Sequence, residues 1–164
     1  MTKQAALAPF SLDDLDASVE TPYEFEYEMP NGEMSGVWIS VHGSQHPQVV
    51  AEIERLVDDR RRREGMAAMR AQKSGRNDEP TFLPTREDRE FTNRLAAVRV
   101  AGWRKPGEAS GLTDEQTKRF RGLDAPFSPE NALRLVSSNR HISEAVIKES
   151  NDLGHFMKAS RAAS

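Results

Sequence analysis

The chain has 164 residues, of which 37% are hydrophobic, 30% are charged and none is cysteine. This composition predicts a thin core, and it excludes disulfides, thiol nucleophiles and zinc sites built from thiolates. The net charge of −3 gives no global positive excess for nucleic-acid binding, and no apolar run approaches the roughly 20 residues that span a bilayer, so we expect a soluble, intracellular protein that does not bind a membrane.

A β-hairpin is predicted near the N-terminus. Residues 1–21 hold few large apolar side chains and are expected to form a flexible arm. In Tyr23–Glu28, aromatic and acidic residues alternate strictly, which predicts a half-buried strand with its aromatic side chains inward. An Asn-Gly turn leads to a second alternating run, Val37–Val41, in which Trp38 faces away from the aliphatic residues.

A long helix is predicted after the hairpin. Apolar residues recur at helical spacing from Val49 to Val57, and the helix then continues into a charged run that includes Arg60–Arg63. We expect this helix to pack on the hairpin, so that residues 22–73 form one domain. The composition of residues 74–84 is that of a linker.

Residues 85–157 are predicted to form a small, mostly helical half, followed by a flexible tail at 158–164. Thr85 begins an approximate capping box, and the helix that follows is expected to end at Gly102, because glycine readily adopts the left-handed conformation of helix ends. A second capping box at Thr113 predicts another short helix. The expected fold class is therefore α+β, with an N-terminal antiparallel hairpin packed on a long helix and a helical C-terminal half.

The clearest helix start lies at Ser128. Its hydroxyl can accept a hydrogen bond from the first helical turn, Pro129 has no amide to leave unpaired, and Glu130 complements the positive end of the helix. Phe127 stands just before this cap. We expect it to fold back on the first turn as a hydrophobic staple against Leu133.

No motif indicates catalysis. The chain has no phosphate-binding glycine loop, no Gly-x-Ser-x-Gly elbow and no His-Glu-x-x-His helix. His42 and His46 are close in the sequence, but they stand in a loop, and zinc needs about four converging ligands. We therefore expect a protein that is not an enzyme and holds no metal or cofactor.

The run Arg60–Arg63 raises the question of nucleic-acid binding, because clustered guanidinium groups bind phosphate. Acidic residues flank the run, and no aromatic side chain is interleaved for base stacking. A solvated helix is the favoured interpretation. Nucleic-acid binding is the weaker alternative.

Two motifs in this order resemble those of the tail assembly chaperones of long-tailed bacteriophages and prophages. The first is the hairpin with its exit into the long helix, and the second is a Gly-Trp pair followed by a Pro-Phe-Ser motif. The residues that carry the resemblance are Met29–Glu33 and Val37–Ser44 in the first motif, and Val100–Trp103 and Pro126–Asn131 in the second, closed by Asn151 and Phe156. One stretch departs from the family's pattern by its greater length, Pro106–Gly122.

The resemblance implies a non-catalytic morphogenesis factor that acts in the host cytoplasm and is absent from the mature virion. Members of the family are taken to bind the tape measure protein, keep this long helical protein soluble and help to recruit major tail tube subunits. A charged, thin-cored molecule suits such temporary binding, and self-association is compatible with it. The alternatives that remain open are a structural tail completion or connector protein of the virion and, less favoured, a nucleic-acid-binding regulator.

Two aromatic residues are predicted to anchor the partner. A transient helper needs exposed apolar side chains, and aromatic rings give a large contact area at a low entropic cost. We therefore expect Trp38, on the outward side of the hairpin, and Phe156, near the C-terminus, to contact the tape measure protein or the tube subunit. Trp103 is expected to lie in the core.

Overall fold

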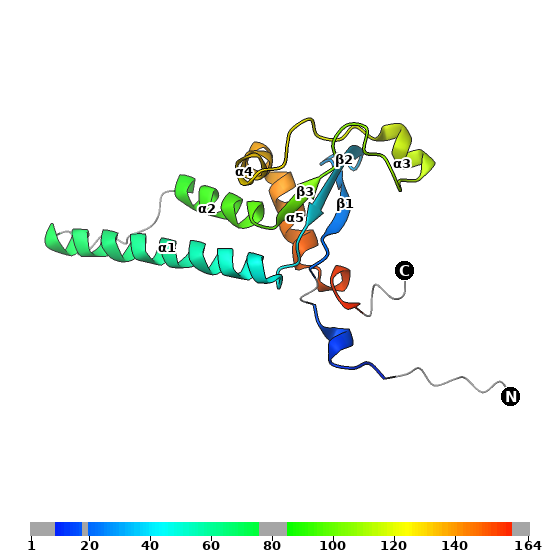
Figure 1. The fold of residues 1–164 in the computed structure, drawn as a ribbon. Coiled ribbons are helices and arrows are strands. Elements are labelled where there is room, and N and C mark those ends of the chain that lie inside the picture. Colours follow the sequence, from blue (N-terminus) through cyan, green and yellow to red (C-terminus); the bar gives the residue numbers. More distant parts are fainter. Residues whose placement is uncertain (1–8, 18–19, 76–84, 159–164) are drawn as a thin grey trace.

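The computed structural model describes residues 9–17, 20–75 and 85–158, and it has the predicted α+β architecture (Figure 1). Three strands form one antiparallel sheet in the order β1-β2-β3. The elements in chain order are η1 (Asp13–Leu15), β1 (Tyr23–Glu28), β2 (Met34–Val41), α1 (Pro47–Lys73), α2 (Thr85–Ala97), β3 (Val100–Trp103), α3 (Asp114–Arg119), α4 (Pro129–Ser138), α5 (Arg140–Asn151) and η2 (Leu153–His155). Within these described residues, no helix combines the length and the apolar character that a membrane crossing requires.

The predicted hairpin is formed by β1 and β2, and its aromatic side faces the core as expected. Phe25 lies opposite Ile39 in the register of the two strands. Tyr27, Ile39 and Val41 are buried members of the core, and Phe25 packs against them. The strict alternation in the sequence therefore identified the correct face, because successive side chains of a strand point to opposite sides.

A third strand stands where the sequence pattern predicts helix up to Gly102. α2 ends at Ala97, and β3 then pairs with β2, so that Trp103 lies opposite Ile39. Gly102 is part of this strand and does not have a positive φ, so it does not end a helix in the predicted way. β-branched residues at the junction favour a strand, and the open edge of β2 supplies the hydrogen-bond partners.

One hydrophobic core joins both halves of the chain. α2, α4 and α5 lie together on the side of the sheet that carries the aromatic residues (Figure 1). The buried residues of the core are Tyr27, Ile39, Val41, Ala96, Val100, Ala132, Val136, Val146 and Phe156. Residues of both predicted domains, 22–73 and 85–157, contribute side chains to this one core, so the packing does not divide between them. Most of the predicted linker, 74–84, lies outside the described residues.

α1 has the predicted helical spacing but packs differently from the expectation. His46 caps its start, because the imidazole Nδ1 accepts a hydrogen bond from the Gln48 backbone N–H at 3.3 Å. Val49 and Leu56 are buried, and the helix runs beside α2 and extends past it (Figure 1). The helices that make the main contacts with the hairpin are α5, which packs on β1 and β2, and α3, which packs on β2, instead of α1.

The two terminal predictions fall largely outside the described residues. Of the predicted N-terminal arm, residues 1–8 and 18–19 are not described. The rest contains one short 3-10 turn, Asp13–Leu15, and a buried Ala17. Of the predicted C-terminal tail, the structure describes Lys158 alone.

Of the two predicted capping boxes, the structure forms the one at Thr113, whereas Thr85 does not stand before its helix. Thr113 caps α3 as expected, since its hydroxyl accepts a hydrogen bond from the Gln116 backbone N–H at 3.3 Å, while the Gln116 side chain accepts one from the Thr113 N–H at 2.9 Å. Thr85 is already the first residue of α2. The residue before it lies outside the described residues.

Ser128 caps α4 as predicted, and its replacement by alanine should lower the free energy of unfolding by about 1 kcal/mol. The Ser128 Oγ accepts a hydrogen bond from the Asn131 backbone N–H at 3.1 Å, and Pro129 is the first helical residue. Urea denaturation would measure the change. Ser137→Ala, an exposed position within the same helix, is the control and should change the free energy by less than about 0.5 kcal/mol. Equal midpoints for the two variants would contradict the capping role.

Candidate partner-binding site

Phe156 lies in the core and is not the exposed anchor that the sequence analysis predicts. Its relative exposure is 0%, and its ring stands edge-on to Tyr23, with the ring centroids 6.4 Å apart. The ring also covers Gly43, where a Cβ atom would stand only 2.8 Å from the Phe156 ring. The expectation of exposure was wrong because a glycine distant in the sequence leaves the room that the aromatic ring fills.

Trp38 is also buried, with a relative exposure of 9%, although it lies on the sheet face opposite the core. The guanidinium carbon of Arg104 lies 5.7 Å from the centre of the indole ring. Arg104 is held in turn by two hydrogen bonds to the Glu24 carboxylate, at 2.6 and 2.8 Å. The prediction that this face leaves Trp38 free for a partner is therefore wrong.

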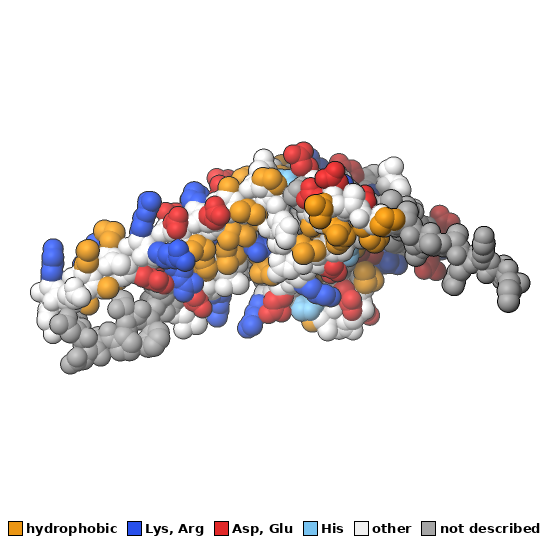
Figure 2. Space-filling view, turned by 90° about the horizontal axis from the view of Figure 1, so that it is seen from below, with side chains coloured by type: hydrophobic (Ala, Val, Ile, Leu, Met, Phe, Trp, Pro, Cys, Tyr) orange, Lys and Arg blue, Asp and Glu red, His pale blue; other side chains and the backbone are white. Residues whose placement is uncertain are grey.

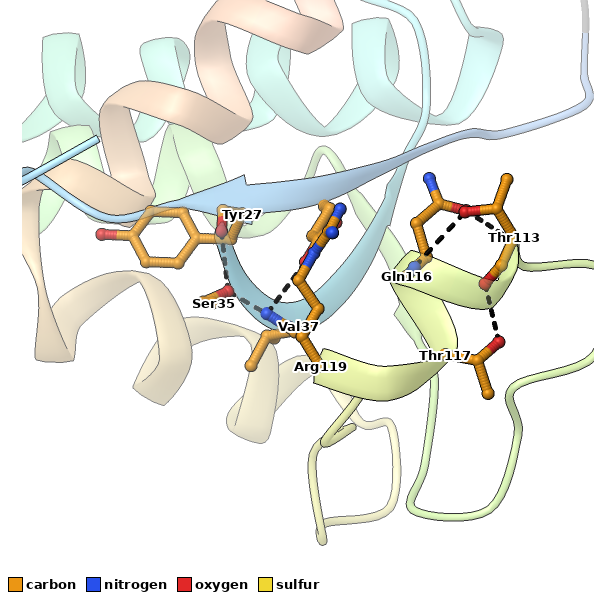
Figure 3. Close-up of polar contacts among 9 residues, drawn as sticks. Tyr27, Ser35, Val37, Thr113, Gln116, Thr117 and Arg119 are labelled. Atoms are coloured by element: carbon orange, nitrogen blue, oxygen red, sulfur yellow. Dashed lines mark hydrogen bonds and ion pairs between the residues drawn. The ribbon is translucent and has the colours of Figure 1, made fainter. Parts of the chain in front are cut away.

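The segment 104–122, which includes the stretch Pro106–Gly122, covers this second face of the sheet. Arg119 of α3 reaches toward the hairpin (Figure 3). Its guanidinium donates two hydrogen bonds of 2.8 Å to the Glu26 carboxylate, which is buried. Gly36 O accepts hydrogen bonds from the backbone N–H groups of Arg121 and Gly122, at 3.0 and 3.3 Å. The acidic residues of β1 thus hold the segment in place through its arginines.

Trp103 and Phe127 form an aromatic pair at the surface beside β3. Their ring centroids are 5.3 Å apart, and their planes are inclined by 76°, which is the favourable edge-to-face arrangement. Phe127 is 46% exposed and Trp103 is half-buried. The structure therefore pairs Phe127 with Trp103, and it places Trp103 at the margin of the core.

Hydrogen bonds hold the loop that carries Phe127. The Trp103 Nε1–H donates to the Ala125 backbone oxygen at 2.9 Å, and the Asn131 side-chain amide donates to the Pro126 backbone oxygen at 2.9 Å. The Gly-Trp pair and the Pro-Phe-Ser motif, which are separate in the sequence, therefore meet at one place. A loop that is already ordered loses little conformational entropy when a partner binds it.

An open groove lies beside the aromatic pair, between the loop and α4. Trp103, Leu123 and Leu135 give it an apolar lining, and Asp124 and Arg134 add one charge of each sign. Tryptophan and arginine, which both line this groove, are among the residues that contribute most to protein–protein binding. Both motifs are visible in the sequence, but nothing in their spacing indicates that they share an exposed surface.

The two histidines of the predicted loop lie side by side at the start of α1. The rings of His42 and His46 are stacked with their centroids 4.3 Å apart, and His46 is occupied in capping α1. Burial, together with the neighbouring His46, lowers the pKa of His42. In the part of the chain that the structure describes, no cluster of three or more His, Asp or Glu side chains is arranged to hold a metal ion.

No protein-family model, curated protein or solved structure matches this chain. The candidate site is defined by the geometry of Trp103, Phe127 and the adjoining groove. That geometry provides an apolar contact surface.

Proposed function

We propose that this chain is a phage tail assembly chaperone, which binds the tape measure protein, keeps it soluble and helps to recruit tail tube subunits without catalysis. The observation that supports the proposal is the aromatic pair of Trp103 and Phe127. Both rings come from the second motif through which the chain resembles the chaperone family. Phe127 is exposed on an ordered loop, and the half-buried Trp103 supports it from the end of β3. In this proposal the protein acts in the host cytoplasm and is absent from the mature virion.

The site suits a partner that must later be released. Phe127 offers about half of its surface to a ligand, and the apolar lining of the neighbouring groove is limited to a few side chains. A contact of modest area with a polar rim favours reversible binding. A tube subunit that covers the same apolar surface of the tape measure protein would then displace the chaperone.

The test is the solubility of the tape measure protein of the same phage when it is co-expressed with this chain. Phe127→Ser should lower the soluble fraction of the tape measure protein, because it removes the most exposed ring of the site. The variant itself should lose no more than a few degrees of melting temperature, since the edge-to-face pair contributes only about 0.5–1.5 kcal/mol. Phe10→Ser is the matched control, because Phe10 is an exposed phenylalanine outside the site. It should leave the partner soluble.

Two results would contradict the proposal. The first is a tape measure protein whose solubility does not depend on co-expression of the wild-type chain. The second is the detection of this chain in finished, purified particles by mass spectrometry, which would assign it to the structural proteins of the tail.

A further inference from the structure

The far half of α1 carries a face that the rest of the described structure does not cover. α2 lies along the near half, where the Arg60 guanidinium contacts Asp88 at 3.0 Å and stands 4.6 Å from the centre of the Phe91 ring. α1 continues well past this contact, to Lys73 (Figure 1). With 3.6 residues per turn, six exposed residues of this extension share one side, which we call the free face of α1. They are Arg62, Arg63, Met66, Met69, Arg70 and Lys73. Arg63 stands at the margin of this face, where it also lines the groove between α1 and α2.

The four cations of the free face differ from the arginines that precede them. Arg60 pairs with Glu64 and Asp88, and Arg61 pairs with Asp58. These pairs agree with the acidic residues that flank the run in the sequence. None of the four forms an ion pair with another residue in the ranges that the structure describes. The far half of α1 therefore has a positive charge that its own acidic residues do not balance.

Two methionines occupy the middle of this basic face. Met66 is 57% exposed and Met69 is 67% exposed, and a spacing of three residues places them on adjacent turns of the same side. Figure 2 shows hydrophobic and basic side chains together at this end of the molecule. Flexible methionine side chains adapt to the surface of a partner helix, and they recur at surfaces that bind helices.

We propose that the free face of α1 binds an acidic amphipathic helix of a partner protein. The apolar side of that helix would pack on Met66 and Met69, and its carboxylates would pair with the flanking cations. The residues from Arg62 to Lys73 rise by about 18 Å along the axis, which matches roughly three turns of a partner helix. The inference deepens the proposed function, on which it rests in taking the partner to be helical.

The chemistry of the face favours a helix over the other anionic partners. The free face has no aromatic side chain on which a base could stack, and the near half of α1 is acidic, with Glu52, Glu54, Asp58 and Asp59. Two methionines also provide too little apolar surface for insertion into a lipid interface, which typically uses tryptophan, phenylalanine and leucine. A helix that is apolar on one side and acidic at its flanks matches both components of the face.

The experiment uses the full chain and two synthetic helical peptides with the same leucine face. One peptide has glutamate at the flanking positions, and the other has lysine. Fluorescence anisotropy should show binding of the glutamate peptide, weakening as salt is added, and little binding of the lysine peptide. Met66→Ser combined with Met69→Ser should lower the affinity for the glutamate peptide by about tenfold or more.

A fourfold charge reversal gives the sharpest outcome. Changing Arg62, Arg63, Arg70 and Lys73 to glutamate should switch the preference to the lysine peptide. The matched control reverses four exposed cations elsewhere, outside the free face and outside the groove beside Trp103, which changes the net charge equally and should leave the preference unchanged; these are Arg89, Lys105, Lys118 and Arg121. Circular dichroism would verify that both variants remain folded.

Three results would overturn the inference. The first is that the fourfold variant does not switch its peptide preference, and the second is that the control switches equally. The third is that the chain binds a single-stranded oligonucleotide or an anionic phosphatidylserine vesicle more tightly than the glutamate peptide.

The inference and the proposed function can fail separately. If the fourfold variant still keeps the tape measure protein soluble, the free face is not the docking surface, although the chaperone role stands. If the peptide preference switches as expected but wild-type chain does not solubilise the tape measure protein, the inference stands and the proposed function fails.

Discussion

Replacing Phe156 with alanine should lower the free energy of unfolding by about 3–5 kcal/mol, because a fully buried aromatic side chain is removed and a cavity remains. The lost ring contacts Tyr23 and covers Gly43, so the change would loosen the attachment of the C-terminal segment to the sheet. Urea denaturation followed by circular dichroism would measure the midpoint and the slope of the transition.

Leu153→Ala is the matched control for Phe156→Ala, because Leu153 lies in the adjacent turn but is one of the exposed apolar residues. Its effect should be smaller, about 1–2 kcal/mol, since part of the Leu153 side chain is already exposed to solvent. A Phe156 variant as stable as the Leu153 variant would place Phe156 outside the core and restore it as a candidate contact residue.

Replacing Gly36 with alanine should lower the free energy of unfolding by about 2–5 kcal/mol, through backbone strain and through overlap with α3. Gly36 has a φ of +77°, and a Cβ atom there would overlap the backbone oxygen of Arg119. Segment 104–122 would have to move away from the hairpin and expose Trp38. A shift of tryptophan fluorescence to longer wavelength should therefore accompany the loss of stability.

Gly111→Ala separates the two causes of the Gly36→Ala effect, which are backbone strain and overlap with α3. Gly111 has a similar φ of +80°, but no atom lies within 4 Å of the position of an added Cβ. Its substitution should cost about 1–2 kcal/mol from backbone strain alone and should leave the fluorescence unchanged. Equal effects at Gly36 and Gly111 would mean that segment 104–122 yields to the added methyl group without cost.

The predictions that hold depend on residues close together in the chain. The alternation in β1 identified its buried side because the pleat places every second side chain on one face. The caps at Thr113 and Ser128 were found because a cap bonds to an amide only three residues ahead. These features need no knowledge of the rest of the fold.

The predictions that fail concern surfaces and pairings. Trp38 was placed on the correct side of the hairpin, but Arg104, from the other half of the chain, covers it. β3 was taken for the end of a helix, because four residues contain too little pattern to indicate that the edge of β2 lies beside them.

By itself, the sequence determined the α+β class, the buried face of the hairpin, the long helix and the starts of α3 and α4, since local hydrogen bonds and side-chain periodicity specify them. Only the tertiary structure decided that Trp38 and Phe156 are buried and that Trp103 and Phe127 meet at the surface. Exposure depends on what packs against a residue from distant parts of the chain. For Phe156 that is the empty space over Gly43, and for Trp38 it is the guanidinium group of Arg104.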